Sequence, residues 1–178
     1  MRLVISPTRA DVPFVNADVI AARRWPHDPA RHAYQAAEIA ASTRAALIQR
    51  GEPFVAETVF SHPSKLDLIR DASAAGYYVA LHVVMIPVEL AVERVAARVT
   101  DGGHDVPVEK IRARFDRLWG LVADAVLLAD TATFYDNTRR SGPTEVALFS
   151  IGVPIGAPFW PAWTPPVITQ HWPGRDTG

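Results

Sequence analysis

The chain has 178 residues, of which 49% are hydrophobic and 21% are charged, and its formal net charge is −1. This composition is typical of a soluble globular domain with a substantial core, and the near-zero charge argues against non-specific nucleic-acid binding, which needs a basic excess. The absence of cysteine excludes disulfides and thiolate metal sites, and we find neither a signal peptide nor an apolar run long enough to span a bilayer. We therefore expect a cytoplasmic protein without a membrane or nucleic-acid partner.

Short apolar stretches alternate with helical patterns along the chain. Apolar and β-branched residues predict strands, and alanine-rich or amphipathic segments predict helices. The expected strands are 1–5, 13–15, 53–56, 77–86, 133–135 and 145–151, and the expected helices are 28–49, 64–75, one that begins at Pro87 and one that ends near Leu128. This alternation indicates an α/β fold in which helices wrap a parallel sheet.

Two regions stand out by composition. The stretch 77–86, YYVALHVVMI, is typical of a central strand covered on both faces, which would make His82 a core residue. Residues 152–178 hold six prolines and three of the five tryptophans. We therefore expect a domain at 1–151 and an extended Pro/Trp-rich tail at 152–178, whose tryptophans favour packing against the domain.

The stretch 94–117 predicts a helical hairpin that presents basic side chains. Arg94 and Arg98 are four residues apart and share a helix face, and the glycines at 102–103 permit a tight connection. The second helix has an apolar stripe opposite its basic residues (Ile111, Phe115, Leu118 and Val122). Guanidinium groups bind phosphate well because their planar fork donates in pairs and stays charged. The alternative is a solvated helix face held by ion pairs, because the stretch holds six basic and four acidic residues.

Carboxylates follow three of the predicted strands. Asp18, Glu57 and Asp136 come directly after FVNA, FVA and TFY. Ligands bind beyond the carboxyl ends of parallel strands, and a carboxylate there can accept a proton from a substrate hydroxyl. The alternative for Asp18 is capping of the following helix, which Asp does well and Glu does poorly.

The histidines predict no metal site, because none of the six has metal-ligand spacing. His104, beside the glycine pair, is the only histidine that we consider for a functional role. Ser61-His62 lacks a nearby acidic partner, which argues against a catalytic triad.

An ordered series of motifs resembles the zeta-toxin-like family of P-loop kinases. The motifs are FVNADVIA, then FVAETVFSHPSKLDLIRDASAAGYYVALHVV, RVAARVTDGGHDVPVEKIRARF and LADTATFYDN, over roughly residues 13–137. The resemblance implies a three-layer P-loop kinase-like α/β fold, with a parallel sheet, helices on both faces and a helical arginine-bearing lid. It also implies transfer of the γ-phosphoryl group of ATP, with Mg²⁺, to a sugar hydroxyl of UDP-N-acetylglucosamine, and a possible antitoxin protein as partner.

The resemblance implies a role for each matching residue. Asp18 would activate the acceptor hydroxyl, and Arg98 and Arg114 would neutralise charge on the transferring phosphoryl group. The remaining residues would bind the sugar nucleotide (Asn16, Glu57, Thr58, Ser61 and Lys65) or belong to the lid (Arg94, His104 and Arg112).

The sequence departs from the family at its phosphate-binding loop. The G-x-x-x-x-G-K-[ST] loop cradles the ATP phosphates, but no glycine precedes Gly51, and the only lysines are Lys65 and Lys110. Residues 1–11 therefore cannot form this loop. Three explanations follow: an N-terminally truncated or misassigned kinase, a catalytically dead relic that binds only sugar nucleotide or a protein partner, or ATP held in an unfamiliar way by lid arginines. A kinase for another hydroxyl, such as that of an antibiotic or nucleoside, is a further reading.

Overall fold

The computed structural model describes residues 12–100 and 106–175. The expected strand 1–5, the glycine pair and His104 lie outside these ranges. The chain divides into two compact units, residues 1–59 and 60–178, and each is described by itself below. Among the helices of the described ranges, none is both long and apolar enough to cross a membrane.

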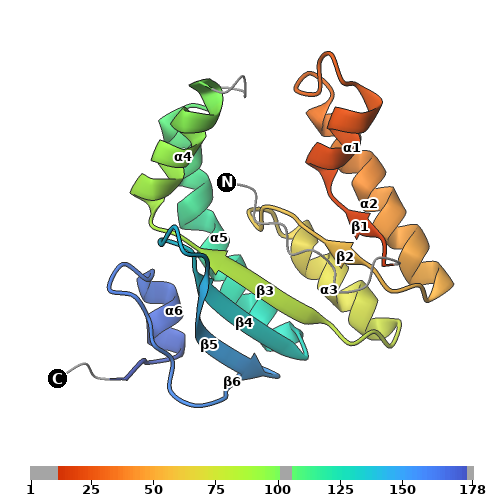
Figure 1. Ribbon diagram of the computed structural model, residues 1–178. Coiled ribbons are helices and arrows are strands. Elements are labelled where there is room, and N and C mark those ends of the chain that lie inside the picture. Colours follow the sequence, from red (N-terminus) through yellow and green to blue (C-terminus); the bar gives the residue numbers. More distant parts are fainter. Residues whose placement is uncertain (1–11, 101–105, 176–178) are drawn as a thin grey trace. The chain divides into compact units, whose positions relative to one another are not determined.

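The first unit packs two helices against a pair of parallel strands (Figure 1). Its elements are β1 (Phe14–Val15), α1 (Ala17–Arg24), α2 (Ala33–Arg50) and β2 (Val55–Ala56). Val15, Ala40 and Leu47 form its buried core, where alanine allows α2 to approach closely. Helix α2 begins five residues later than expected, because the Asp28 carboxylate accepts a hydrogen bond from the Arg31 amide and forms a turn there.

The second unit contains a four-stranded sheet with the order β3-β4-β5-β6. Its strands are β3 (Ala80–Met85), β4 (Thr131–Asp136), β5 (Thr144–Ser150) and β6 (Val153–Pro154). Strands β3 and β4 are parallel, whereas β5 and β6 are antiparallel to their neighbours. The connection between β4 and β5 is too short for a crossover helix, so the chain returns as a hairpin. The fold is mixed α/β with parallel strand pairs and helices, consistent with the expected P-loop kinase-like fold.

The core of this unit lies on one face of the sheet. Met85, Phe134 and Phe149 come from three adjacent strands and are fully buried there. On β3 burial alternates, and His82 is exposed, with its Nδ1 3.2 Å from the Tyr135 hydroxyl. The prediction that His82 is a core residue in a strand covered on both faces was therefore wrong. A continuous apolar run does not by itself indicate that both faces are buried.

The helices in the described part of this unit are α3 (Ser64–Ala74), α4 (Val88–Thr100), α5 (Val108–Leu128) and α6 (Pro166–His171). Of the expected apolar stripe of α5, Val122 is buried in the core, and Phe115 and Leu118 are partly buried and pack against it. Trp119 and Val126, which were not predicted as part of the stripe, are also buried there. Helix α4 lies beside α5, as the hairpin prediction required (Figure 1).

The segment after β5 is anchored to the core by tryptophans. The Trp160 indole N–H donates to the Trp172 carbonyl oxygen at 2.7 Å, and the Trp172 indole N–H donates to the Gly152 carbonyl oxygen at 2.9 Å. Ile168 of α6 is fully buried. We expected an extended segment here, and the structure also contains β6 and α6 within it.

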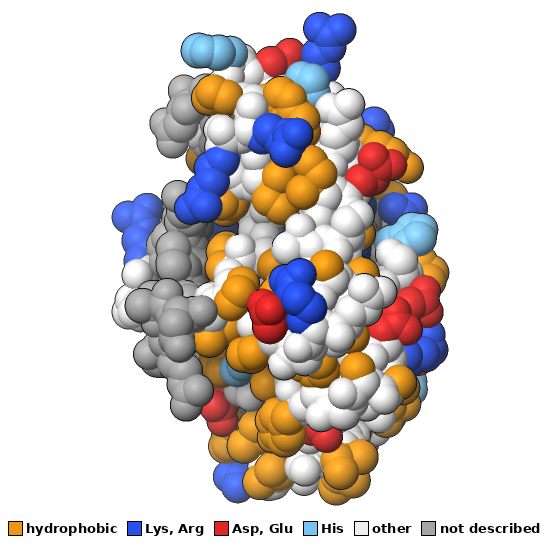
Figure 2. Space-filling model, turned by 90° about the vertical axis from the view of Figure 1, so that its right-hand side faces the viewer, with side chains coloured by type: hydrophobic (Ala, Val, Ile, Leu, Met, Phe, Trp, Pro, Cys, Tyr) orange, Lys and Arg blue, Asp and Glu red, His pale blue; other side chains and the backbone are white. Residues whose placement is uncertain are grey.

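Charged side chains are dispersed on the side of the molecule shown in Figure 2. Basic, acidic and hydrophobic side chains are interspersed there, and the described residues on this side form no large patch of a single charge. This dispersion accords with a net charge of −1.

Candidate functional site

Asn16 is fixed at the junction between β1 and α1. Its side-chain oxygen accepts a hydrogen bond from the Val19 amide at 3.0 Å, which makes Asn16 the N-cap of α1. Its side-chain nitrogen donates to Glu57 Oε2, also at 3.0 Å. Both ends of the amide are therefore used, and the Glu57 carboxylate is held in one orientation. The alternative role of Asp18 as the cap was wrong, because Asn16 occupies that position.

Asp18 and Glu57 follow neighbouring parallel strands. Phe14 pairs with Val55 and Val15 with Ala56, so β1 and β2 end at the same edge of their sheet. The Glu57 amide extends this pairing by donating to the Val15 carbonyl oxygen at 3.3 Å. Asp18 lies in the first turn of α1, and the side chains of Asp18, Glu57 and Thr58 are exposed. We call Asn16, Asp18, Glu57 and Thr58 the acceptor edge.

The remaining predicted site residues belong to the second unit. Ser61 is half-buried before α3, and Lys65 is half-buried in the first turn of that helix. Arg94 and Arg98 lie on α4, and Arg112 and Arg114 lie on α5. The side chain of Arg98 lies outside the described part of the structure. Arg114 is exposed and makes no ion pair with any described residue.

Arg94 binds the backbone at the end of β4. Its Nη2 atom donates to the Asn137 carbonyl oxygen at 2.8 Å. The Asn137 amide in turn donates to the Met85 carbonyl oxygen at 2.9 Å. These contacts tie α4 and the ends of β3 and β4 together. Asn137 is buried, and its side-chain oxygen has no partner among the described residues. Sequence reasoning missed this role for Asn137, although its place directly after a strand was the available signal.

Arg112 forms an ion pair across the hairpin. Its Nη1 atom lies 3.1 Å from Glu89 Oε1, in the first turn of α4. A hydrogen bond from the backbone amide of Glu89 itself, followed by the hydrogen bond from Arg112, lowers the pKa of this carboxyl. Ion pairing, the alternative reading of the hairpin's charges, therefore holds for this arginine.

Replacing Glu89 with glutamine is expected to reduce stability in a pH-dependent way. A carboxyl with a lowered folded-state pKa stabilises the protein above its unfolded value, here 4.5, and this contribution disappears as the pH falls through the lower folded value. The difference in Tm between Glu89→Gln and the parent should be small at pH 7, because the pair is exposed, and it should shrink as the pH falls below 4.5. Thermal unfolding over this pH range measures it. Glu93→Gln, one turn later on α4, is the control, and an equal effect there would contradict the assignment.

The described residues hold no cluster suited to a metal ion, and the sequence holds no ATP phosphate loop. Among the described residues there is no group of three or more His, Asp or Glu side chains that could hold a metal ion. Residues 1–178 contain no G-x-x-x-x-G-K-[ST] sequence. The residues present therefore cannot bind the ATP phosphates in the way that the family's loop does.

Comparison with known proteins identifies the family. The model of the zeta toxin family matches residues 25–138, which is more than half of the chain. The chain belongs to the zeta toxin family. The zeta toxin family is kinase-like and nucleotide-binding. The matched range contains Glu57, Thr58 and the α4–α5 hairpin, whereas Asn16 and Asp18 precede it and the tryptophan-anchored segment follows it. No curated protein and no solved structure matches the chain.

Proposed function

We propose that the chain is the acceptor-binding part of a kinase that transfers the γ-phosphoryl group of ATP to a hydroxyl of a sugar nucleotide, with UDP-N-acetylglucosamine as the substrate. The observation that carries this proposal is the Asn16–Glu57 hydrogen bond beside Asp18. It provides an oriented carboxylate and a second, exposed carboxylate at one sheet edge. Hydroxyl-rich ligands are bound through such acceptors.

Asp18 accepts the proton of the attacking hydroxyl in this proposal. The oxygen of that hydroxyl forms the new bond to phosphorus as the bond to the leaving ADP breaks, and the proton moves to the Asp18 carboxylate. Glu57, held by Asn16, accepts hydrogen bonds from other sugar hydroxyls. Thr58, Ser61 and Lys65 extend the substrate contacts. The chain's contribution is mainly to position the acceptor.

The hairpin arginines supply positive charge. Arg114 is exposed and unpaired among the described residues, so it is available to a phosphoryl group, and we assign the same role to Arg98. Arg94 and Arg112 hold the hairpin through Asn137 and Glu89. We assign His104 to the lid as well. When bound with ATP, Mg²⁺ would neutralise phosphate charge. Since the residues present do not form the phosphate loop, we derive no step through the nucleotide.

The test compares this chain with a version preceded by a strand and a G-x-x-x-x-G-K-[ST] loop. Both proteins are incubated with Mg²⁺, γ-labelled ATP and UDP-N-acetylglucosamine, and the labelled sugar nucleotide is measured. We expect label transfer by the loop-bearing version and very little by the chain alone, because the loop contacts stabilise the transition state. A loop-bearing protein that binds ATP but labels no sugar nucleotide would contradict the proposed acceptor. Transfer to a nucleoside or an antibiotic instead would support a kinase for another hydroxyl.

The missing loop sequence favours a second candidate function, a non-catalytic binding protein. Such a protein would keep the acceptor edge and bind a sugar nucleotide without ATP. Alternatively, it would bind an antitoxin protein. Calorimetric titration with UDP-N-acetylglucosamine in the absence of ATP tests the first possibility. Binding that Glu57→Gln weakens, without label transfer by the loop-bearing version, would favour this reading over the kinase.

A further inference from the structure

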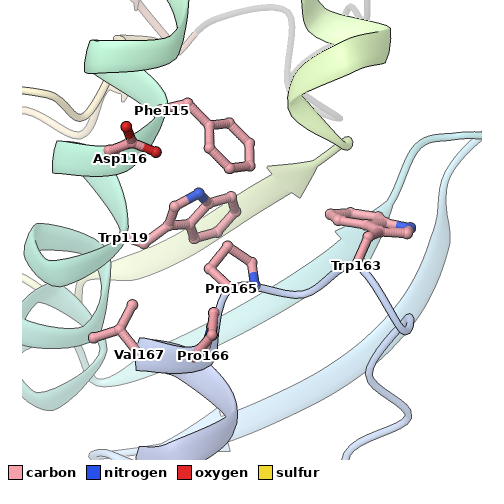
Figure 3. A pocket seen from close by; sticks show the side chains of 7 residues that line it. All are labelled: Phe115, Asp116, Trp119, Trp163, Pro165, Pro166 and Val167. Atoms are coloured by element: carbon pink, nitrogen blue, oxygen red, sulfur yellow. The ribbon is translucent and has the colours of Figure 1, made fainter.

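A cavity of about 360 Å³ lies between α5 and the segment that leads into α6 (Figure 3). One side comes from α5 and the other from the C-terminal segment, and both belong to the second unit. The lining residues are Phe115, Asp116, Trp119, Trp163, Pro165, Pro166 and Val167. The volume falls within the range of roughly 300–1,000 Å³ that is usual for small-molecule sites. Residues 163–167 follow the part matched by the family, whereas Phe115, Asp116 and Trp119 lie within it. None of the lining residues is among those assigned to acceptor binding or to the lid.

Aromatic rings dominate the walls of the cavity. Phe115 and Trp119 meet edge to face, with ring centroids 5.5 Å apart and planes at 73°. Trp163 lies across from them, with Pro165 between (Figure 3). Phe115 and Trp163 are only half-buried, so part of each ring remains accessible to a ligand. Aromatic ring faces carry negative charge density and attract cations.

Asp116 adds a full negative charge to this aromatic lining. On a helix its expected partner is Arg112, four residues earlier, but that guanidinium binds Glu89 instead. Asp116 is exposed and makes no ion pair with a described residue, and no lysine or arginine lines the cavity. The lining therefore carries an uncompensated negative charge next to accessible ring faces.

Trp119 contributes an unsatisfied donor. Its side chain is 4% exposed, and its indole N–H has no acceptor among the described residues. A buried donor without a partner destabilises the protein. This N–H is itself buried, so a hydroxyl or carbonyl oxygen of a ligand would supply the missing acceptor only by reaching below the accessible surface of the cavity.

We propose that this cavity binds a compact organic cation, an alkylammonium or quaternary ammonium group attached to a short body with one hydrogen-bond acceptor. The cationic group lies against the accessible parts of the Phe115 and Trp163 rings and near the Asp116 carboxylate. The apolar part of the ligand contacts the prolines and Val167. Choline carries both a quaternary ammonium and a hydroxyl group, so it serves as the probe.

Indole N–H signals in two-dimensional NMR spectra test this site directly. The five tryptophans give five signals, and the protein is titrated with choline chloride against equal sodium chloride. The signals of Trp119 and Trp163 should shift saturably, with a Kd of about a millimolar, while that of Trp25 in the first unit should not. The neutral carbon isostere of choline, in which tert-butyl replaces trimethylammonium, should bind at least about fivefold more weakly, because only the cation is attracted by the rings and Asp116.

Matched variants separate this site from a general charge effect. Asp116→Asn should weaken choline binding about fivefold, whereas Asp124→Asn, which removes the same charge two turns later on α5, should change it less than about twofold. Trp163→Ala, at a half-buried position, should abolish the shift of Trp119. No saturable shift, equal binding of the neutral isostere, or equal effects of the two aspartate variants would overturn the proposal.

Discussion

Replacing Trp172 with alanine is expected to lower the free energy of unfolding of the second unit by about 4 kcal/mol. Trp172 is 7% exposed and packs edge to face on Phe149, with ring centroids 4.9 Å apart. Its indole N–H also satisfies the carbonyl oxygen of buried Gly152 at 2.9 Å. The substitution therefore removes a large apolar side chain and leaves a buried acceptor unpaired. Urea denaturation followed by tryptophan fluorescence measures the loss, because four of the five tryptophans lie in this unit.

Two further variants divide this effect into its parts. Trp172→Phe keeps most of the aromatic ring but loses the indole N–H donor. We expect it to lower the free energy of unfolding by about 1–2 kcal/mol, because the Gly152 carbonyl oxygen is left unpaired. Phe159→Ala removes an aromatic ring that is 58% exposed. We expect it to lower the free energy of unfolding by less than about 1 kcal/mol. Equal losses for Trp172→Ala and Phe159→Ala would show that the C-terminal segment does not stabilise this core.

Elements with strong local signals were predicted closely from the sequence. The apolar stripe of α5 recurs at helical spacing, and it is the face that packs in the core. Gly51 follows α2 with φ +66°, the left-handed conformation that ends many helices and that glycine adopts without strain. In these cases a few neighbouring residues determine the structure, so the sequence pattern is sufficient.

The direction of β5 and the exposed face of β3 could not be predicted in the same way. Both depend on which strand or helix lies alongside, and apolar strand residues are compatible with either arrangement. Strand β5 follows a short connection and runs antiparallel to β4. The alternation of strands and helices predicted a parallel sheet, which holds for β3 and β4 but does not extend to β5, because no helix intervenes between β4 and β5.

The acceptor edge was partly predictable. Carboxylates directly after strands indicated that Asp18 and Glu57 follow strand ends, and the parallel pairing of β1 and β2 places those ends at one edge. The hydrogen bond from Asn16 to Glu57 spans 41 positions, and that from Arg94 to Asn137 spans 43. Such contacts depend on strand register and helix placement, and the spacing of residues along the sequence does not determine either of them.

Replacing Asp18 with asparagine in the loop-bearing protein is expected to lower kcat for sugar-nucleotide phosphorylation about 10³-fold, within the usual range for loss of a general base. Asparagine has nearly the same shape and can still contact a hydroxyl, but it cannot accept its proton. The KM for UDP-N-acetylglucosamine should change less than about threefold, because the Asn16–Glu57 pair, to which we assign the orientation of the sugar, remains. Steady-state kinetics at saturating ATP measure both constants.

The fold should tolerate this substitution, because Asn16 rather than Asp18 caps α1. Losing a carboxylate from the first turn of a helix reduces stability by only about 0.5 kcal/mol. Thermal unfolding of Asp18→Asn should therefore match that of Glu38→Gln, an exposed carboxylate change on α2 whose kcat should stay at the parent value. If Asp18→Asn keeps most of its kcat, the proton leaves by another route and Asp18 serves only to position the hydroxyl. A lowered kcat together with a lowered Tm would instead indicate damage to α1 rather than loss of the base.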